Sequence, residues 1–263
     1  MATIPPDIQN AIEEAWQKAR IVPGFLGENE ARFLGLLAAS TPATGAIVEI
    51  GSFKGKSTVM LASVAARYGL GPVVAIDPHT APSVTDPTVE EGASTFGEFS
   101  ASLRSSGVEA HVEVHRVRSR EAAAGWARPI RLLWIDGDHT YAGAKEDFEL
   151  FSPHLASGGV IAFHDALNAY EGPIRVFVED VLRSNQFGAA GFVHSIAWSQ
   201  FRPADGAAFL GQRNLLARRA ARLIPFVASG RRVHGLRKIG YKLCRSRVPR
   251  TGVSPAEWAN MVT

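Results

Sequence analysis

The sequence has almost no cysteine, because Cys244 is the only one among 263 residues. A single thiol excludes an internal disulfide and fits a reducing cytoplasm, and no nucleophile-activating pattern surrounds it, so we interpret it as structural. No apolar run reaches the ~18 residues of a membrane span. The first twenty residues contain acidic side chains and no apolar core, so we expect no secretory signal and a cytoplasmic protein.

Acidic residues are absent from one long segment near the C-terminus. Between Arg213 and Arg250 there are twelve Lys or Arg and no Asp or Glu, whereas the rest of the chain has 16 basic and 25 acidic residues. Residues 213–250 therefore predict contact with an anionic surface, or with the acidic body itself. Four interpretations remain: cover for the body or a dimer partner, an anionic membrane or lipid carrier, nucleic acid, or disorder. Nucleic acid is disfavoured, since only two aromatic residues of the Phe and Tyr type, Phe226 and Tyr241, lie between the arginines.

Short apolar runs alternate with segments of helical periodicity along most of the chain. The predicted strands are Ala46–Ile50, Pro72–Ile76, Ala110–Arg116, Leu132–Ile135 and Val160–Phe163. The predicted helices are Asp7–Arg20, Glu28–Ala39, Ser57–Tyr68, Thr95–Ser106, Ser119–Trp126, Tyr141–Phe151 and Pro173–Asn185. This alternation is typical of a parallel, doubly wound α/β sheet, in which ligands bind at the carboxyl ends of the strands. We expect N-terminal helices in residues 1–45, a catalytic domain in 46–205 and a basic helical tail in 206–263.

The glycine-rich stretch after the first strand reads IGSFKGKST and is similar to a phosphate-binding P-loop. A P-loop requires four residues between its glycines, but Gly51 and Gly55 enclose only three. Phe53 occupies the place of the second glycine of a dinucleotide fingerprint, which disfavours a dehydrogenase. Asp77 ends the next strand, where a carboxylate can bind both ribose hydroxyls of a nucleoside.

The residues EIGSFKG followed by Ile76-Asp77 resemble motifs I and II of class I S-adenosylmethionine (SAM) dependent methyltransferases. The resemblance implies a Rossmann-like fold in which the glycine loop passes the methionine part of SAM and Asp77 holds the ribose. It places Arg118 and Ser119 near the adenine. The cofactor-binding residues that it implies are Glu49, Gly51, Ser52, Phe53, Gly55, Ser57, Asp77, Arg118, Ser119 and Asp136.

Two further predicted strands end in acidic residues and histidines, in LLWIDGDHTY and GGVIAFHDALN. Carboxylates that converge at a sheet edge repel one another unless a cation or a proton joins them. Asp136 and Asp165 are therefore predicted to share a hard cation, with magnesium the natural choice. The alternative is structural, because Asp138 and Asp165 could each cap a helix or turn.

This pattern is similar to metal-dependent sugar O-methyltransferases, grouped with macrocin-type and cephalosporin-hydroxylase-like proteins, over roughly residues 28–201. The resemblance implies Mg²⁺ or Mn²⁺ bound by Asp136 and Asp165, with His164 in a third position that is acidic in the group. Its catalytic base is His139 or Asp138. We favour His139, because an imidazole with a pKa near 6.5 accepts a proton at neutral pH better than a carboxylate near 4.

The sequence thus predicts a SAM-dependent O-methyltransferase that acts on a sugar hydroxyl, of a saccharide, polysaccharide, glycolipid or glycosylated metabolite. A non-catalytic SAM-binding protein that acts through its basic tail is the alternative. We also expect a homo-oligomer, in the cytoplasm or at the membrane periphery. Acceptor specificity is predicted to reside in the long Pro78–Ser94 connection and in the helices before Gly45.

Overall fold

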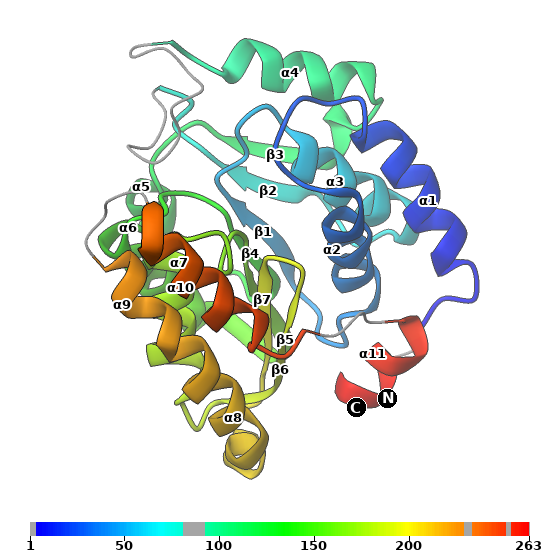
Figure 1. Ribbon diagram of the computed structural model, residues 1–263. Helices are drawn as coiled ribbons and strands as arrows, with labels where there is room; N and C mark the ends of the chain where they lie inside the picture. The colour runs from blue at the N-terminus through cyan, green and yellow to red at the C-terminus, as the bar shows by residue number, and fades with distance from the viewer. Residues whose placement is uncertain (1–3, 81–92, 229–232, 251–253, 263) are drawn as a thin grey trace.

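The computed structural model describes residues 4–80, 93–228, 233–250 and 254–262 (Figure 1). Seven strands form one sheet: β1 (Ala46–Ile50), β2 (Val73–Ile76), β3 (Val112–His115), β4 (Ile130–Ile135), β5 (Leu155–Phe163), β6 (Phe187–Val193) and β7 (Ile196–Phe201). Their order across the sheet is β3-β2-β1-β4-β5-β7-β6. The strands β1 to β5 pair in parallel, and β7 runs antiparallel to both β5 and β6.

The strand order reverses between β1 and β4, because β2 and β3 lie on one side of β1 and β4 and β5 on the other. A crevice opens at the carboxyl ends of the strands at such a point, and ligands of doubly wound sheets bind there. The register pairs Ile50 at the end of β1 with Ile76 of β2 and Ile135 of β4. The residues that follow these three strands are Gly51, Asp77 and Asp136, which therefore start from the same edge.

Helices cover both faces of the sheet (Figure 1). The first group comprises α1 (Ile8–Ala19), α2 (Glu28–Ser40), α3 (Lys56–Tyr68) and α4 (Phe96–Ser105), and the opposite group comprises α5 (Ser119–Ala123), α6 (Tyr141–Phe151), α7 (Glu171–Val176) and the π-helical η3 (Phe177–Leu182). Short 3₁₀ turns are η1 (Glu109–His111), η2 (Ser152–His154), η4 (Gly206–Phe209) and η5 (Ala221–Leu223). The sheet is thus buried between two helical layers, as its almost uninterrupted apolar strands predict.

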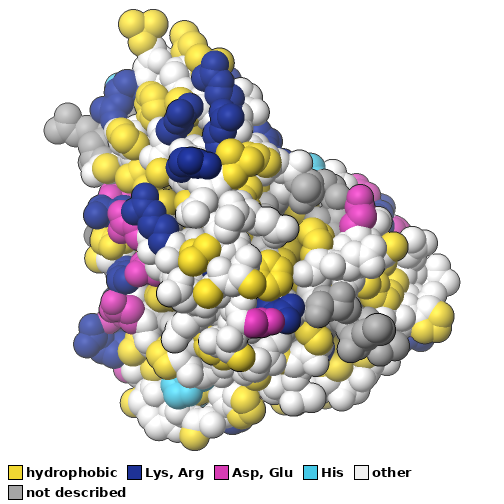
Figure 2. All heavy atoms as spheres, turned by 90° about the horizontal axis from the view of Figure 1, so that it is seen from below, with side chains coloured by type: hydrophobic (Ala, Val, Ile, Leu, Met, Phe, Trp, Pro, Cys, Tyr) yellow, Lys and Arg dark blue, Asp and Glu magenta, His cyan; other side chains and the backbone are white. Residues whose placement is uncertain are grey.

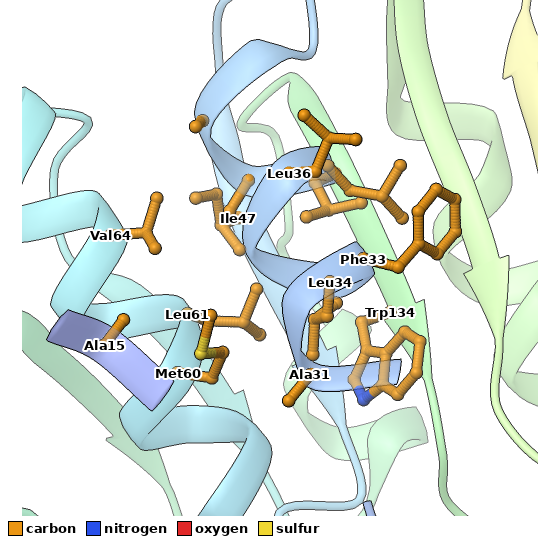
Figure 3. Close-up of a cluster of buried hydrophobic side chains, with 14 of the residues drawn as sticks. Ala15, Ala31, Phe33, Leu34, Leu36, Ile47, Met60, Leu61, Val64 and Trp134 are labelled. Atoms are coloured by element: carbon orange, nitrogen blue, oxygen red, sulfur yellow. The ribbon is translucent and has the colours of Figure 1, made fainter. Parts of the chain in front are cut away.

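The first hydrophobic core lies between α2, α3 and the sheet (Figure 3). Leu34 of α2, Leu61 of α3 and Trp134 of β4 are fully buried in it. Gly35 lets α2 approach α3 closely, because a Cβ atom there would lie 2.5 Å from the methyl group of Met60. This packing fixes α2 over the sheet and thereby fixes Glu30, on the first turn of α2, near the carboxyl ends of the strands.

The fold that the sequence predicts is confirmed, with differences at the element ends and in the last strands. Predicted strand Ala46–Ile50 and helix Tyr141–Phe151 coincide with β1 and α6, and the other predicted elements overlap their observed counterparts. The antiparallel pair β6 and β7 was not predicted. Its sequence, FGAAGFVHSIAWSQF, has glycines and small residues in place of a β-branched run, so its strand pattern is weak.

The C-terminal segment contains α8 (Leu210–Ala220), α9 (Ile224–Val227), α10 (Gly235–Ser246) and α11 (Pro255–Val262). Some of its side chains belong to the core. Arg213 is fully buried and donates hydrogen bonds to the carbonyls of Val181, Ser184 and Gly206. Trp258 of α11 is also fully buried and packs against Phe33 and Trp198. Arg213 therefore stabilises the fold. Two other basic residues of the segment 213–250, Arg231 and Arg232, lie outside the described residues.

None of the helices in the described parts of the chain has the length and hydropathy that crossing a membrane requires.

Candidate active site

The glycine loop begins at Gly51, directly after β1. Its backbone φ is 87°, and its N–H donates a 2.9 Å hydrogen bond to the carbonyl of Ile76. A Cβ atom at this position would lie 2.2 Å from the carbonyl oxygen of Asp136. Only glycine tolerates both the positive φ and this approach. The residue therefore brings the ends of β1, β2 and β4 into direct contact.

Asp77 holds the glycine loop in place. Its Oδ2 accepts hydrogen bonds of 2.8 Å from the backbone N–H groups of Ser52 and Phe53, and its Oδ1 accepts one of 2.7 Å from His79. Phe53 has a φ of 47°, so this conformation is strained for a residue with a side chain. The carboxylate that the sequence assigns to a ribose thus also fixes the loop. Two carboxylate oxygens accept about four hydrogen bonds, which leaves capacity for a ribose hydroxyl.

We expect Asp77→Asn to weaken SAM binding about tenfold or more, because it replaces one acceptor oxygen with a donor that faces two N–H groups. Isothermal titration calorimetry with SAM measures this affinity. Ser94→Ala serves as the control, because the Ser94 hydroxyl accepts hydrogen bonds from the N–H of Phe96 and the side chain of Arg116 instead. Unchanged affinity for Asp77→Asn would remove Asp77 from the cofactor site.

Glu49 lies beneath the loop and does not line the cavity described below. It is fully buried, and its Oε2 accepts hydrogen bonds from the hydroxyls of Ser52 and Thr58 at 2.9 and 2.5 Å. Burial raises the pKa of Glu49 to about 7, although the hydroxyl groups of Ser57, Thr58 and Ser52 act in the opposite direction. Glu49 therefore acts through the loop, whose serine it positions.

The protonation of Glu49 makes stability depend on pH. Its folded pKa exceeds the usual 4.5, so the folded protein holds the proton more tightly than the unfolded chain does. The free energy of unfolding should thus fall as pH rises from about 4.5 to about 7, by an amount on the order of 3 kcal/mol from this group. Glu49→Gln should flatten this part of the profile, as urea unfolding at pH 5 and pH 8 would measure. Equal pH dependence in both proteins would contradict the assignment.

A cavity of about 530 Å³ opens at the carboxyl ends of β1, β2 and β4, a size typical of small-molecule sites. With the exceptions of Glu49 and Gly55, the predicted site residues all line it: Gly51, Ser52, Phe53, Ser57, Asp77, Arg118, Ser119, Asp136, Asp138, His139, His164 and Asp165. Gly55 instead begins α3 with a φ of 94°. Phe25 and Leu26, before α2, also line the cavity, and Phe25 stacks on Phe53 with ring centroids 6.0 Å apart. Most of the Pro78–Ser94 connection lies outside the described residues.

Asp147 of α6 lines the cavity and was not predicted from the sequence. It is buried next to Ser119, and burial raises its pKa to about 7 against the opposing hydrogen bond from the Ser119 hydroxyl. A buried carboxyl that faces a cavity is a candidate for ligand binding. It lies mid-helix, eleven residues after Asp136, so helical periodicity alone could not separate it from the half-buried Glu146 and the exposed Glu149.

Asp136, His139 and Asp165 form a cluster at the end of the cavity near β4 and β5. One ligand atom from each lies within 4.8 Å of the others. The Nε2 atom of His139 is 3.6 Å from Oδ1 of Asp136 and 3.5 Å from Oδ2 of Asp165. These separations are too long for hydrogen bonds but short enough for a shared cation or a bridging hydroxyl. The two carboxylates, Asp136 and Asp165, are the ligand type that suits Mg²⁺ or Mn²⁺, whereas an imidazole ligand is more typical of zinc, iron or copper.

His164 lies behind this cluster and is almost fully buried. Its Nδ1 is 3.0 Å from Oδ1 of Asp136, and its Nε2 is 3.5 Å from Oε2 of Glu30. Burial lowers the pKa of His164, but the carboxylates of Asp136 and Glu30 outweigh it and raise the pKa well above its usual value. Because both ring nitrogens face carboxylates, His164 is placed to orient Asp136. In the cluster of possible metal ligands, the structure places His139, and not the predicted His164, together with Asp136 and Asp165.

Glu30 completes this arrangement and was not predicted from the sequence. It accepts hydrogen bonds from the N–H and the hydroxyl of Ser195 and from the N–H of Gly27. Burial would raise its pKa, but His164 and these donors lower it to about 2, so Glu30 is a fixed anion. Glu30 lies more than 130 residues from His164 in the sequence. Its hydrogen bond from the N–H of Gly27, at the start of α2, is already sufficient reason for a glutamate at this position. No sequence signal therefore linked it to the site.

Asp165 and His139 are each held by their surroundings. Asp165 has a φ of 55°, a strained conformation for aspartate, and its Oδ1 accepts a 2.6 Å hydrogen bond from the side chain of Asn168. The ring of His139 stacks on that of Tyr170, with centroids 4.5 Å apart. Burial lowers the pKa of His139, but the carboxylates of Asp136 and Asp165 outweigh it and raise the pKa.

Asp138, the other candidate base, has a local structural role. Its Oδ1 accepts a 2.8 Å hydrogen bond from the N–H of Thr140, which itself caps α6 through Gly143. A Cβ atom on Gly143 would lie 2.5 Å from Cβ of Asp138, so the glycine makes room for this turn. Asp138 therefore fixes the start of α6 and lines the cavity, while His139 faces the two aspartates.

Comparisons with known proteins give a domain match and a shared fold. Residues 48–166 match the family model of a methyltransferase domain, and this region includes Gly51, Asp77, Asp136 and Asp165. The cofactor-bound protein Rv0187 from MTB has a similar structure (TM-score 0.53, 20% identity, 76% of this chain and 91% of that chain). So does the O-methyltransferase NovP (TM-score 0.57, 11% identity, 74% and 98%). A third is an O-methyltransferase from Bacillus cereus in complex with SAH (TM-score 0.50, 20% identity, 75% and 92%).

The domain match and the fold together confirm the predicted enzyme class, a SAM-dependent methyltransferase of the class I fold. At these identities the structural likeness shows the fold alone and does not identify the acceptor.

Proposed function

We propose that this protein transfers the methyl group of SAM to a hydroxyl oxygen of a saccharide, with the help of Mg²⁺ or Mn²⁺. The observation that carries the proposal is the position of Asp136, His139 and Asp165, within 4.8 Å of one another in the cavity that the glycine loop also lines. An alkyl hydroxyl is a weak nucleophile near neutral pH, so its methylation benefits from a base next to a cation site.

Each residue has one role in this mechanism. Asp77 and the loop that it fixes hold the cofactor, which supplies a methyl group activated by its sulfonium. Asp136 and Asp165 would hold the cation, which would supply Lewis-acid activation of the acceptor hydroxyl. The acceptor oxygen forms a bond to the methyl carbon as the carbon–sulfur bond breaks, and His139 accepts the hydroxyl proton at Nε2. Fixing the two reactants in line is worth roughly 7–11 kcal/mol in well-oriented intramolecular reactions.

His164 and Glu30 act as positioning residues for Asp136. Three side chains lie in a row with alternating negative, positive and negative charges: Glu30, His164 and Asp136. Each group therefore stabilises the charged form of its neighbour. Burial would raise the pKa of Asp136, but His164 and His139 outweigh it and hold the pKa below its usual value. Asp136 therefore stays ionised and available to a cation.

A saccharide acceptor is supported by the sequence resemblance to sugar O-methyltransferases and by the mixed character of the cavity. Phe25 and Phe53 provide an apolar wall, and the carboxylate of Asp138 provides a hydrogen-bond acceptor. Sugars are bound by such combinations, because their faces are apolar and their edges carry hydroxyls.

A screen with isotope-labelled SAM over mono- and oligosaccharides tests the proposal. We expect label transfer in the presence of Mg²⁺ or Mn²⁺ and its loss after EDTA treatment, with recovery when the metal is added back. Full activity after exhaustive removal of metal would reject the cation, and SAM binding without transfer to any hydroxyl would favour the non-catalytic alternative.

A further inference from the structure

We propose that the outer face of α10 binds the surface of an anionic lipid bilayer. Leu236, Ile239 and Leu243 are 85%, 65% and 53% exposed, although each is a large hydrophobic residue. Their spacing of three and four residues places them on one side of the helix. An exposed apolar stripe of this kind is unfavourable in water and is typical of a helix that lies in a membrane interface.

Basic residues flank this stripe, and α10 contains no acidic residue. At 100° per residue, Arg237 lies on one side of the stripe and Lys238 and Lys242 on the other. All three are exposed, but Arg237 donates hydrogen bonds to the carbonyls of Pro225 and Phe226. The long side chains of Lys238 and Lys242 can extend to lipid headgroups while the apolar residues enter the bilayer. In the upper part of Figure 2, Lys and Arg side chains alternate with hydrophobic ones, and acidic side chains lie lower.

The opposite face of α10 is fixed to the body, so the helix is not a loose appendage. Tyr241 is buried, and its hydroxyl accepts a 2.8 Å hydrogen bond from the N–H of Ala169. Arg245 donates to the carbonyl of Leu167, and Phe226 packs on the ring of Tyr241. Residues 167 and 169 belong to the loop that follows Asp165. The helix therefore supports the wall of the cavity that carries Asp165, and a bilayer bound to α10 would lie beside that wall.

The charges on α10 favour lipid over a second copy of the chain. A two-fold contact between two α10 stripes would bring Arg237, Lys238 and Lys242 close to their own copies, with no acidic residue on the helix to compensate. An anionic bilayer offers both an apolar interior for the stripe and negative charge for its flanks. This inference stands on the surface alone and does not depend on the proposed methyl transfer.

Vesicle co-sedimentation with the full chain tests the proposal. We expect the protein to bind phosphatidylcholine vesicles that contain phosphatidylglycerol, to bind pure phosphatidylcholine at least about tenfold more weakly, and to lose binding as salt increases. The variant Leu236→Ser/Ile239→Ser/Leu243→Ser should lose binding, as should Lys238→Glu/Lys242→Glu. Leu215→Ser, which changes an exposed leucine of α8, is the matched control and should bind like the unmodified protein.

The thermal unfolding temperature and the SAM affinity should be the same in all variants. A loss of vesicle binding then results from the changed surface and not from unfolding. Vesicle binding by the triple serine variant equal to that of the unmodified protein would overturn the proposal, as would equal binding to neutral and anionic vesicles. A dimer that light scattering detects in the unmodified protein, and that the triple variant converts to a monomer without any vesicle binding, would assign the stripe to self-association instead.

Discussion

Asparagine in place of Asp136 is expected to reduce methyl transfer about 10³-fold or more, while SAM binding changes little. Asp136 is one of two carboxylates in the predicted cation site, and it is also the partner of His164 at 3.0 Å. The change removes a charge from the site, so the cation is lost together with the several kcal/mol that Lewis-acid catalysis supplies, at about tenfold in rate for each 1.36 kcal/mol. Single-turnover transfer and Mn²⁺ titration by electron paramagnetic resonance would measure both effects.

The matched control is Asp205→Asn, because Asp205 pairs with Arg202 at the surface and lies outside the cavity. It should leave transfer and Mn²⁺ binding unchanged. If Asp136→Asn retained tight Mn²⁺ binding, the carboxylate would not be a ligand. If it lost SAM binding to the same degree as transfer, the residue would act on the cofactor, a contact that the sequence also predicts.

Much of this site follows from the sequence because its residues lie directly after strands. Gly51, Asp77, Asp136 and Asp165 each follow an apolar run, and parallel strands deliver their carboxyl ends to one edge. Their convergence is therefore a property of the fold class, and the domain match from residue 48 to residue 166 covers the same elements.

The contacts that the cavity-lining residues make with the side chains behind them could not be predicted in this way. Glu30 reaches His164 only because α2 packs on the sheet, with Gly35 permitting its close approach to α3. Neither the distance in sequence nor the helical pattern of α2 indicates this contact. The same holds for Tyr241, whose hydrogen bond to the loop after Asp165 depends on how the C-terminal helices fold back.

The histidines illustrate the same distinction. His139 and His164 are equivalent in the sequence, since each lies next to an acidic residue at the end of a strand. In the structure, His164 directly follows β5, is almost fully buried and packs its ring against Trp134 at a centroid distance of 5.4 Å, whereas His139 lies in the loop after β4 and stacks on Tyr170. Which of the two rings is buried depends on how the loops after β4 and β5 fold, and the sequence pattern does not indicate this.

Glutamine in place of His139 is expected to lower kcat by about 10²–10⁴-fold, because this is the usual contribution of a positioned general base. Metal affinity should change little if Asp136 and Asp165 hold the cation. The side chain of glutamine reaches a similar position and can hydrogen-bond, but it cannot accept the hydroxyl proton. Transfer rates over a range of acceptor concentrations would separate the loss in kcat from a change in KM, and Mn²⁺ titration would measure the affinity.

His111→Gln serves as the control, since His111 is exposed in η1 and lies outside the cavity. A parallel loss of Mn²⁺ affinity and kcat in His139→Gln would make His139 a ligand of the cation and would leave Asp138 as the candidate base. Asp138→Asn then becomes decisive. Its Oδ1 already accepts the N–H of Thr140, so an asparagine with its own oxygen in that place keeps the turn intact. A loss of kcat in a correctly folded Asp138→Asn variant would therefore report proton transfer and not a disrupted α6.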